Sequence, residues 1–171
     1  MFDEALTLIE AMENIKYDVV NYNTLINYDN SQNGTLRDLE ERLKYFSASV
    51  TIPYERRDVS YFVTATLQGK IIGIVSFGIY GSRQDYWAMS YISVDPSYRR
   101  LGISKGLIQK NIEWLKDHKI FEFNISALED EGKLGKIGET YFEIGKQNGV
   151  DIKLSKLSEY DQALEKRLRN E

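Results

Sequence analysis

The stretch VDPSYRRLGIS, residues 94–104, joins two segments of different pattern and decides the fold. Before it, YWAMSYISV (86–94) is apolar and aromatic, which predicts a strand. After it, apolar residues recur at helical spacing from Ile103 to about Lys119, which predicts a long helix. Pro96 lies between the two segments. We therefore expect a strand, a turn and a helix in direct succession.

The start of this helix has the features of a diphosphate-binding site. The first backbone N–H groups of a helix have no acceptor within the helix, and the helix dipole gives them partial positive charge. Gly102 would let a ligand approach the backbone closely, while Arg99 and Arg100 add charged, forked donors. Ser104 adds a hydroxyl group. The alternative interpretation of the two arginines is a solvated surface turn.

The rest of the chain predicts a mixed α/β protein of the α+β type. Alternating segments predict further strands at 16–22, 61–67, 70–80, 121–128 and 150–157, with a hairpin turn between the second and third of these. Helical spacing predicts further helices at 2–12, 35–46, 139–148 and 158–171, and the polar segment 30–34 predicts a loop. This order indicates a single domain over residues 1–171, with a central mixed sheet flanked by helices and extra N-terminal and C-terminal helices.

The composition restricts the class of protein. A chain of 171 residues that is 42% hydrophobic fits one compact domain. The formal net charge of -4 provides no global field for nucleic acid or for an anionic membrane surface. The chain has no cysteine and a single histidine, His118, so we expect no disulfide and no metal site. The acidic start and the lack of a long apolar run predict a cytoplasmic protein.

The residues quoted above resemble a known cofactor signature. VDPSYRRLGIS is similar to the acetyl-coenzyme A signature of the GNAT superfamily of N-acetyltransferases, in which a strand ends in V-x-P-x-x-R and is followed by (Q/R)-x-x-G-x-(G/A). Arg99 falls on the Q/R position, Gly102 on the glycine and Ser104 on the last small residue. The order of strands and helices is also similar over roughly residues 16–155.

The resemblance implies a binding mode for acetyl-coenzyme A. The backbone amides of Leu101, Gly102, Ile103 and Ser104 would hold the pyrophosphate, with Arg99 and Arg100 beside it. The pantetheine arm would run along Ile92, Ser93 and Val94, where two neighbouring strands separate. Lys133 and Lys136 would either contact the adenosine 3'-phosphate or lie in a solvated loop.

The resemblance also implies a proton donor for the leaving thiolate. Family members often use a tyrosine in a Y-x-x-x-G pattern, which Tyr141 and Gly145 fit here. The alternative is that Tyr141 is a core residue, since the chain has 12 tyrosines. The strand at 86–94 contains no carboxylate for a general base. The alternatives for the base are Asp85, Glu122 or a water chain that passes Ser90, Tyr91 or Asn124. We assign none of them.

These features predict an N-acetyltransferase that moves an acetyl group from acetyl-coenzyme A to a primary amine by direct attack. The amine would belong to a small molecule or a peptide. Three departures from the family pattern leave an alternative open. Ser104 stands in place of Gly or Ala, the Asn that the family has near 129–138 is lacking, and no last strand is obvious. This alternative is a degenerate, non-catalytic module that binds coenzyme A or a protein partner. A further alternative is a homodimer in which a partner subunit completes the acceptor site. Another is a site for nucleic-acid phosphates, which the net charge disfavours.

Overall fold

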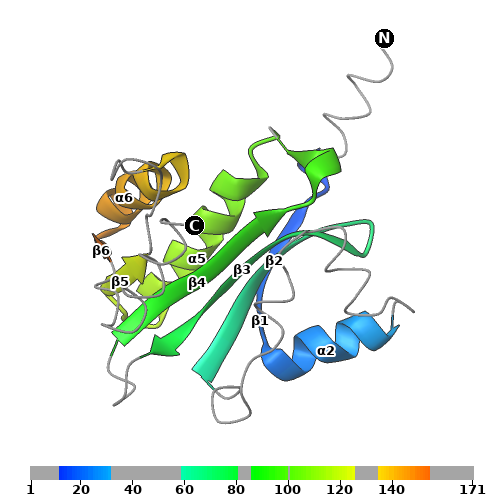
Figure 1. Cartoon of the computed structure of the whole chain (residues 1–171), viewed down its shortest axis with the longest axis horizontal. Coiled ribbons are helices and arrows are strands. Elements are labelled where there is room, and N and C mark those ends of the chain that lie inside the picture. The colour runs from blue at the N-terminus through cyan, green and yellow to red at the C-terminus, as the bar shows by residue number, and fades with distance from the viewer. Residues whose placement is uncertain (1–11, 32–58, 81–85, 100, 126–134, 155–171) are drawn as a thin grey trace, which may run out of the picture.

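The computed structural model describes residues 12–31, 59–80, 86–99, 101–125 and 135–154. Within these ranges the strands form one six-stranded mixed sheet in the order β1-β2-β3-β4-β5-β6 (Figure 1). The strands are β1 (Lys16–Asn21), β2 (Ser60–Leu67), β3 (Lys70–Tyr80), β4 (Tyr86–Val94), β5 (Glu122–Ile125) and β6 (Asp151–Leu154). The helices are α2 (Tyr22–Ser31), α5 (Ile103–Asp117) and α6 (Lys136–Asn148), with a 3-10 turn η2 (Pro96–Tyr98). The predicted mixed sheet flanked by helices is confirmed.

The sheet has an antiparallel half and a parallel half. β1 to β4 pair antiparallel, whereas β4–β5 and β5–β6 pair parallel. β2 and β3 form the predicted hairpin, and its turn residues Gln68 and Gly69 have φ values of 51° and 76°. Two successive positive φ angles are typical of a two-residue hairpin turn, because this turn matches the twist of the strands. The hairpin therefore follows from its own local sequence.

β4 carries one additional residue, Ser90, where its ladder with β3 shifts register. Before this bulge, Trp87 and Met89 pack against the core on the helix side of the sheet. After it, Ile92 and Val94 pack against the same core. A bulge inserts one residue into one strand of a pair and so changes the phase of its alternation. Both halves of β4 thereby face α5 and α6.

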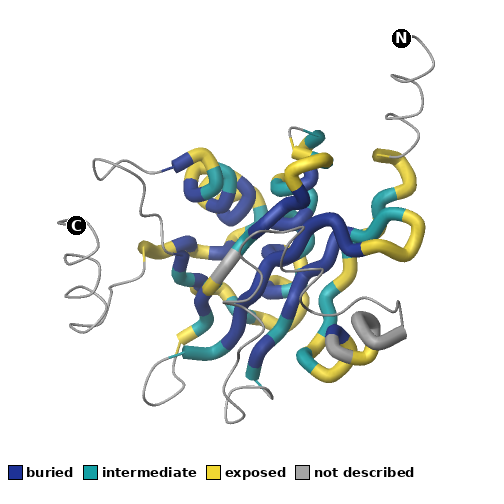
Figure 2. The backbone as a smooth tube through the Cα atoms, turned by 45° about the vertical axis from the view of Figure 1, so that its right-hand side comes forward, coloured by how far each residue is buried: buried dark blue, intermediate teal, exposed yellow. Residues whose placement is uncertain are grey.

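The main core lies between the sheet and helices α5 and α6. α5 contacts the four antiparallel strands, and α6 lies beside α5 and β6 (Figure 1). A Cβ added to Gly73 of β3 would lie 3.1 Å from Ile103 Cγ2 and 3.1 Å from Leu107 Cδ1, so the first turns of α5 lie very close to the sheet. β2, β3 and the inward face of α5 are buried over most of their length (Figure 2). This packing fixes where α5 begins.

The helix α2 was not predicted. The sequence analysis placed Tyr22 in a strand and 30–34 in a loop, but a helix extends from Tyr22 to Ser31. Asn21 Oδ1 accepts a hydrogen bond from the Thr24 N–H at 2.9 Å, as in an N-cap, and Leu25 is buried. Asparagine, tyrosine and threonine have weak helix propensity, so tertiary packing of Leu25 decides the conformation.

Three predicted helices fall largely or wholly outside the described residues. These are the N-terminal helix at 2–12, the helix at 35–46 and the C-terminal helix at 158–171, and they stay predictions. In the part of the chain that is described, no helix has the length and apolar character needed to cross a bilayer.

Candidate active site

The two parallel strands β4 and β5 pair at one end only. Their ladder consists of the pair Ala88↔Asn124 in the described residues. Asn124 Nδ2 reinforces this end by donating to the Trp87 carbonyl oxygen at 3.0 Å. Further along β4, residues 92–94 line a cavity. The end of β4 that feeds α5 therefore borders this cavity.

The cavity has a volume of about 650 Å³ and is formed by β4, η2 and the first turns of α5 and α6. Pockets of this size bind small molecules and cofactors. Seven of the nine residues predicted to bind the cofactor line it: Ile92, Ser93, Val94, Arg99, Gly102, Ile103 and Ser104. The structure thus brings together residues that the sequence places on a strand, a turn and a helix.

The N-terminus of α5 opens into this cavity. Gly102 is the N-cap residue with φ 76°, and in the described part of the chain no side chain caps the helix. Apart from Gly102 and its chain neighbours, no atom of the described residues lies within 4 Å of the position that a Cβ at Gly102 would take. The first bond within the helix runs from the Gly106 N–H to the Gly102 carbonyl at 3.1 Å, so the amides of Ile103, Ser104 and Lys105 precede it. These amides are suited to an anionic group.

The cavity is lined by positive charge. Arg99, Lys105 and Lys136 contribute to the lining, and none of the described lining residues is Asp or Glu. Arg99 Nε donates to the Val94 carbonyl oxygen at 3.2 Å, which anchors the guanidinium at the end of β4, beside the cavity. This local field contrasts with the net charge of -4 for the whole chain.

Two predicted cofactor residues have other positions. Leu101 is half-buried and packs against the main core, and it does not line the cavity. Arg100 lies outside the described residues. Lys136, for which a solvated loop was one alternative, is the first residue of α6 and lines the cavity, whereas Lys133 lies outside the described residues.

Tyr141 lies in the core below the cavity. Its side chain is 0% exposed, and its hydroxyl donates to Asn111 Oδ1 of α5 at 2.8 Å. Burial raises the pKa of the Tyr141 phenol well above its usual value, which stabilises the neutral form. Tyr141 does not line the cavity. This position favours the core interpretation, and the role of Tyr141 as proton donor stays a prediction.

Known proteins that resemble this chain indicate its family. The profile of the acetyltransferase (GNAT) family matches residues 25–130, which is 106 of the 171 residues. The chain belongs to the GNAT acetyltransferase family. No curated protein sequence matches it.

Solved structures share the GNAT fold with this chain. An aminoglycoside acetyltransferase, HMB0005, from an uncultured soil metagenomic sample superposes with a TM-score of 0.51 at 16% identity, covering 84% of this chain and 96% of that one. A ribosomal-protein-alanine N-acetyltransferase from Brucella melitensis biovar Abortus 2308 gives a TM-score of 0.51 at 13% identity, with the same coverage of 84% and 96%. At these identities the likeness shows the fold alone.

Four residues of the cavity at the N-terminus of α5 were not predicted. Tyr98, Lys105, Ile137 and Thr140 also line it. The predicted helix at 139–148 begins earlier, at Lys136, so the sequence analysis missed the turn that contains Ile137. Ile137 and Thr140 are three residues apart and share one helix face, which was the available signal.

No general base is assigned in the GNAT site. Glu122 is exposed, and its Oε1 lies 2.8 Å from Lys153 Nζ in an ion pair. Ser90 Oγ donates to the Ser76 carbonyl oxygen at 3.1 Å, and Asn124 is engaged with β4 as described above. Asp85 lies outside the described residues. Of the candidates, Glu122 lies in this exposed ion pair and is not among the residues that line the cavity.

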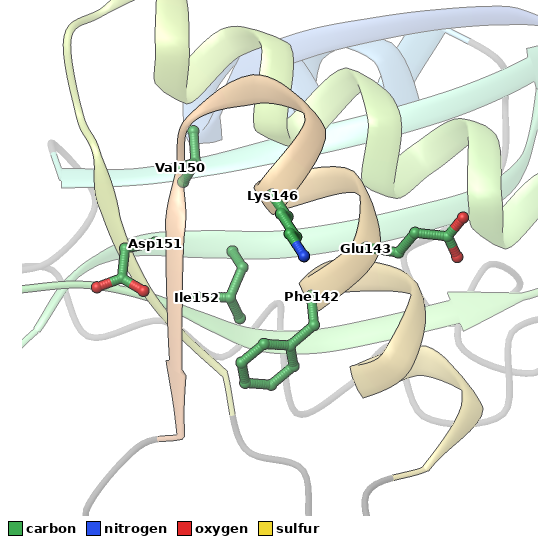
Figure 3. Close-up of a pocket in the computed structure, with 6 residues that line it drawn as sticks. All are labelled: Phe142, Glu143, Lys146, Val150, Asp151 and Ile152. Carbon is green, nitrogen blue, oxygen red and sulfur yellow. The ribbon is translucent and has the colours of Figure 1, made fainter.

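A second cavity, of about 400 Å³, lies at the junction of α6 and β6 (Figure 3). Figure 3 shows Phe142 and Lys146 beside Ile152, whereas the carboxylates of Glu143 and Asp151 point away on either side. Among the described residues, this cavity shares no lining residue with the one at the N-terminus of α5. Its polar groups do not converge, so we place the candidate site in the first cavity.

Proposed function

We propose that this chain is a single-domain N-acetyltransferase that moves the acetyl group of acetyl-coenzyme A to a primary amine. The amine nitrogen attacks the thioester carbonyl carbon, the carbon–sulfur bond breaks, and an amide and the coenzyme A thiolate form. The amine loses one proton to solvent or to a base, and the thiolate gains one. No metal takes part in the proposed reaction.

The observation that carries this proposal is the N-terminus of α5, which no described side chain caps, at a cavity lined by positive charge. The amides of Ile103, Ser104 and Lys105, together with Arg99, would hold the pyrophosphate. Arg100 and the Leu101 amide, which the resemblance adds, stay part of the proposal. The pantetheine arm would then lie along β4 at residues 92–94, because these residues line the same cavity. Binding on this edge would direct the thioester toward the paired end of β4 and β5.

A thiol-release assay tests the proposal directly. Acetyl-coenzyme A is mixed with the protein and with a panel of amines that contains aminoglycosides, polyamines, peptides with a free N-terminus and lysine. We expect coenzyme A release that depends on both the protein and one class of amine. Calorimetry with acetyl-coenzyme A should show binding without any amine. No binding at millimolar cofactor would contradict the proposal.

A non-catalytic coenzyme A module is the second candidate. It is favoured by the placement of the Tyr141 hydroxyl on Asn111 and by the lack of a carboxylate among the described cavity residues. This candidate predicts coenzyme A binding with no thiol release for any amine in the panel. The same two measurements therefore separate the candidates.

Partner and location remain proposals of the same kind. We propose a cytoplasmic protein that acts on a small-molecule or peptide amine, without a nucleic-acid or membrane partner. β6 is the edge of the described sheet, and a second subunit that completes the acceptor site is compatible with this position. Light scattering at assay concentration measures whether the chain is a monomer or a homodimer.

A further inference from the structure

A buried polar pair joins α5 to α6. Tyr141 and Asn111 are both 0% exposed, and their hydrogen bond of 2.8 Å is the only one between these two helices in the described residues. Asn111 Nδ2 has no hydrogen-bond partner within the described structure. A buried donor without a partner lowers stability, and two apolar residues of similar shape would avoid this cost. The presence of the pair therefore calls for a role besides stability.

Tyr141 determines how far α6 stands from its neighbours. One turn later, a Cβ added to Gly145 would lie 2.6 Å from Ile152 Cγ1, so α6 contacts β6 closely there. At Tyr141 the helix carries a large ring instead, which packs on Phe123 of β5 with a centroid distance of 5.9 Å. Its hydroxyl extends to Asn111. The second half of α6 is thus held by β6, and the first half by the Tyr141 side chain.

The first half of α6 is also a wall of the cavity. Ile137 lines the cavity and lies one turn before Tyr141 on the same side of α6. Thr140, which directly precedes Tyr141, also lines the cavity. On α5, Ser104 lies two turns before Asn111, which is about 10 Å along the helix. The polar pair therefore closes the gap between the helices directly below the cavity. A change in the distance that this hydrogen-bonded pair spans would move the first half of α6 relative to the N-terminus of α5.

We propose that Asn111 and Tyr141 are positioning residues that set the spacing of α5 and α6 and thereby fit the α6 wall to coenzyme A. The proposal rests on the proposed coenzyme A site. It gives Tyr141 a role that acts through the position of Lys136, Ile137 and Thr140, without contact between its hydroxyl and the reacting atoms.

Three variants of the full chain test this proposal. Tyr141→Phe keeps the ring and removes the hydrogen bond. Asn111→Leu removes the polar partner at similar volume, and the double variant leaves no polar group at either position. Val63→Ala, a buried change on β2, is the control for loss of stability alone. For each variant, calorimetry gives the Kd for coenzyme A, the thiol-release assay gives kcat, and hydrogen exchange reports residues 136–141.

We expect Tyr141→Phe to raise the Kd for coenzyme A about threefold to tenfold and to speed exchange at 136–141 about fivefold, as the loss of one hydrogen bond would. The double variant should regain thermal stability and still bind coenzyme A weakly. A merely structural pair would give wild-type Kd in the double variant, as Val63→Ala should.

Two results would overturn the proposal. Unchanged Kd together with unchanged exchange at 136–141 in Tyr141→Phe would show that the pair sets no spacing. A large fall in kcat at unchanged Kd would instead assign the proton-donor role to Tyr141. If the wild type binds no coenzyme A, the proposed function fails, and the exchange rates alone decide whether the pair positions α6.

Discussion

Replacing one backbone amide at the start of α5 tests the proposed diphosphate site most directly. Ser104 is the second residue of α5, and its N–H precedes the first bond within the helix. Proline is tolerated in the first turn of a helix because its missing N–H has no partner there in any case. Ser104→Pro therefore deletes one candidate phosphate donor and leaves the helix bonds in place. Ser104→Ala is the matched control, because it loses the hydroxyl and keeps the amide.

The expected effect follows from one hydrogen bond to a charged group. Such a bond contributes about 1.5–3 kcal/mol, which corresponds to a roughly 10-fold to 150-fold change in Kd. We expect the Kd of Ser104→Pro for acetyl-coenzyme A to exceed that of Ser104→Ala by this ratio. The ratio isolates the amide, since both variants lack the hydroxyl.

Calorimetry measures both Kd values, and circular dichroism with thermal melting confirms that each variant is folded. The cavity around Ser104 contains Arg99 and Lys105, so the titrations should be run at one ionic strength. Equal affinity of the two folded variants would refute the reasoning, because the α5 amides would then make no contact with the cofactor. It would leave the fold and the family unchanged.

Three further predictions follow from the structure. Tyr141→Phe should make the free energy of unfolding less sensitive to alkali, because burial raises the pKa of Tyr141 in the folded state. Above about pH 10 the unfolded wild type therefore binds fewer protons than the folded protein, and the wild type loses up to about 1.4 kcal/mol of stability per pH unit. Urea denaturation of both proteins at pH 8 and pH 11 measures this difference. Gly145→Ala should lower the free energy of unfolding by about 2 kcal/mol, because its Cβ would lie 2.6 Å from Ile152 Cγ1 and 2.7 Å from the Val150 carbonyl oxygen; an unchanged urea midpoint would contradict this. Arg99→Gln should weaken acetyl-coenzyme A binding several-fold and reduce its salt dependence, as calorimetry at two salt concentrations would show.

Local sequence signals explain the elements that were predicted well. β3 and β4 were predicted with their observed bounds, because alternating or apolar runs end at turn residues such as Gly69 and Pro96. The start of α5 at Ile103 was predicted because Gly102 interrupts the chain directly before a helical pattern. Each of these signals lies within a few residues of the feature that it determines.

The features that were missed depend on contacts between distant segments. α2 is stabilised by the burial of Leu25, which its Asn-rich sequence does not indicate. The position of Tyr141 was uncertain in the sequence because a Y-x-x-x-G pattern does not say which way the side chain faces. The buried partner Asn111, 30 residues earlier, decides this. Thr140, the residue directly before Tyr141, does line the cavity.

The additional residue in β4 has a consequence for how this strand can change. Met89 and Ile92 are three residues apart, and both face the helices only because the bulge takes up Ser90. Deleting Ser90 would restore a regular ladder without turning the strand over, because Met89 and Ile92 would then be two residues apart and would stay on one face. A regular ladder that kept Ser90 would instead place these two residues on opposite faces and turn Ser93 toward the core. Homologous chains should therefore lose the bulge only together with the residue at this position.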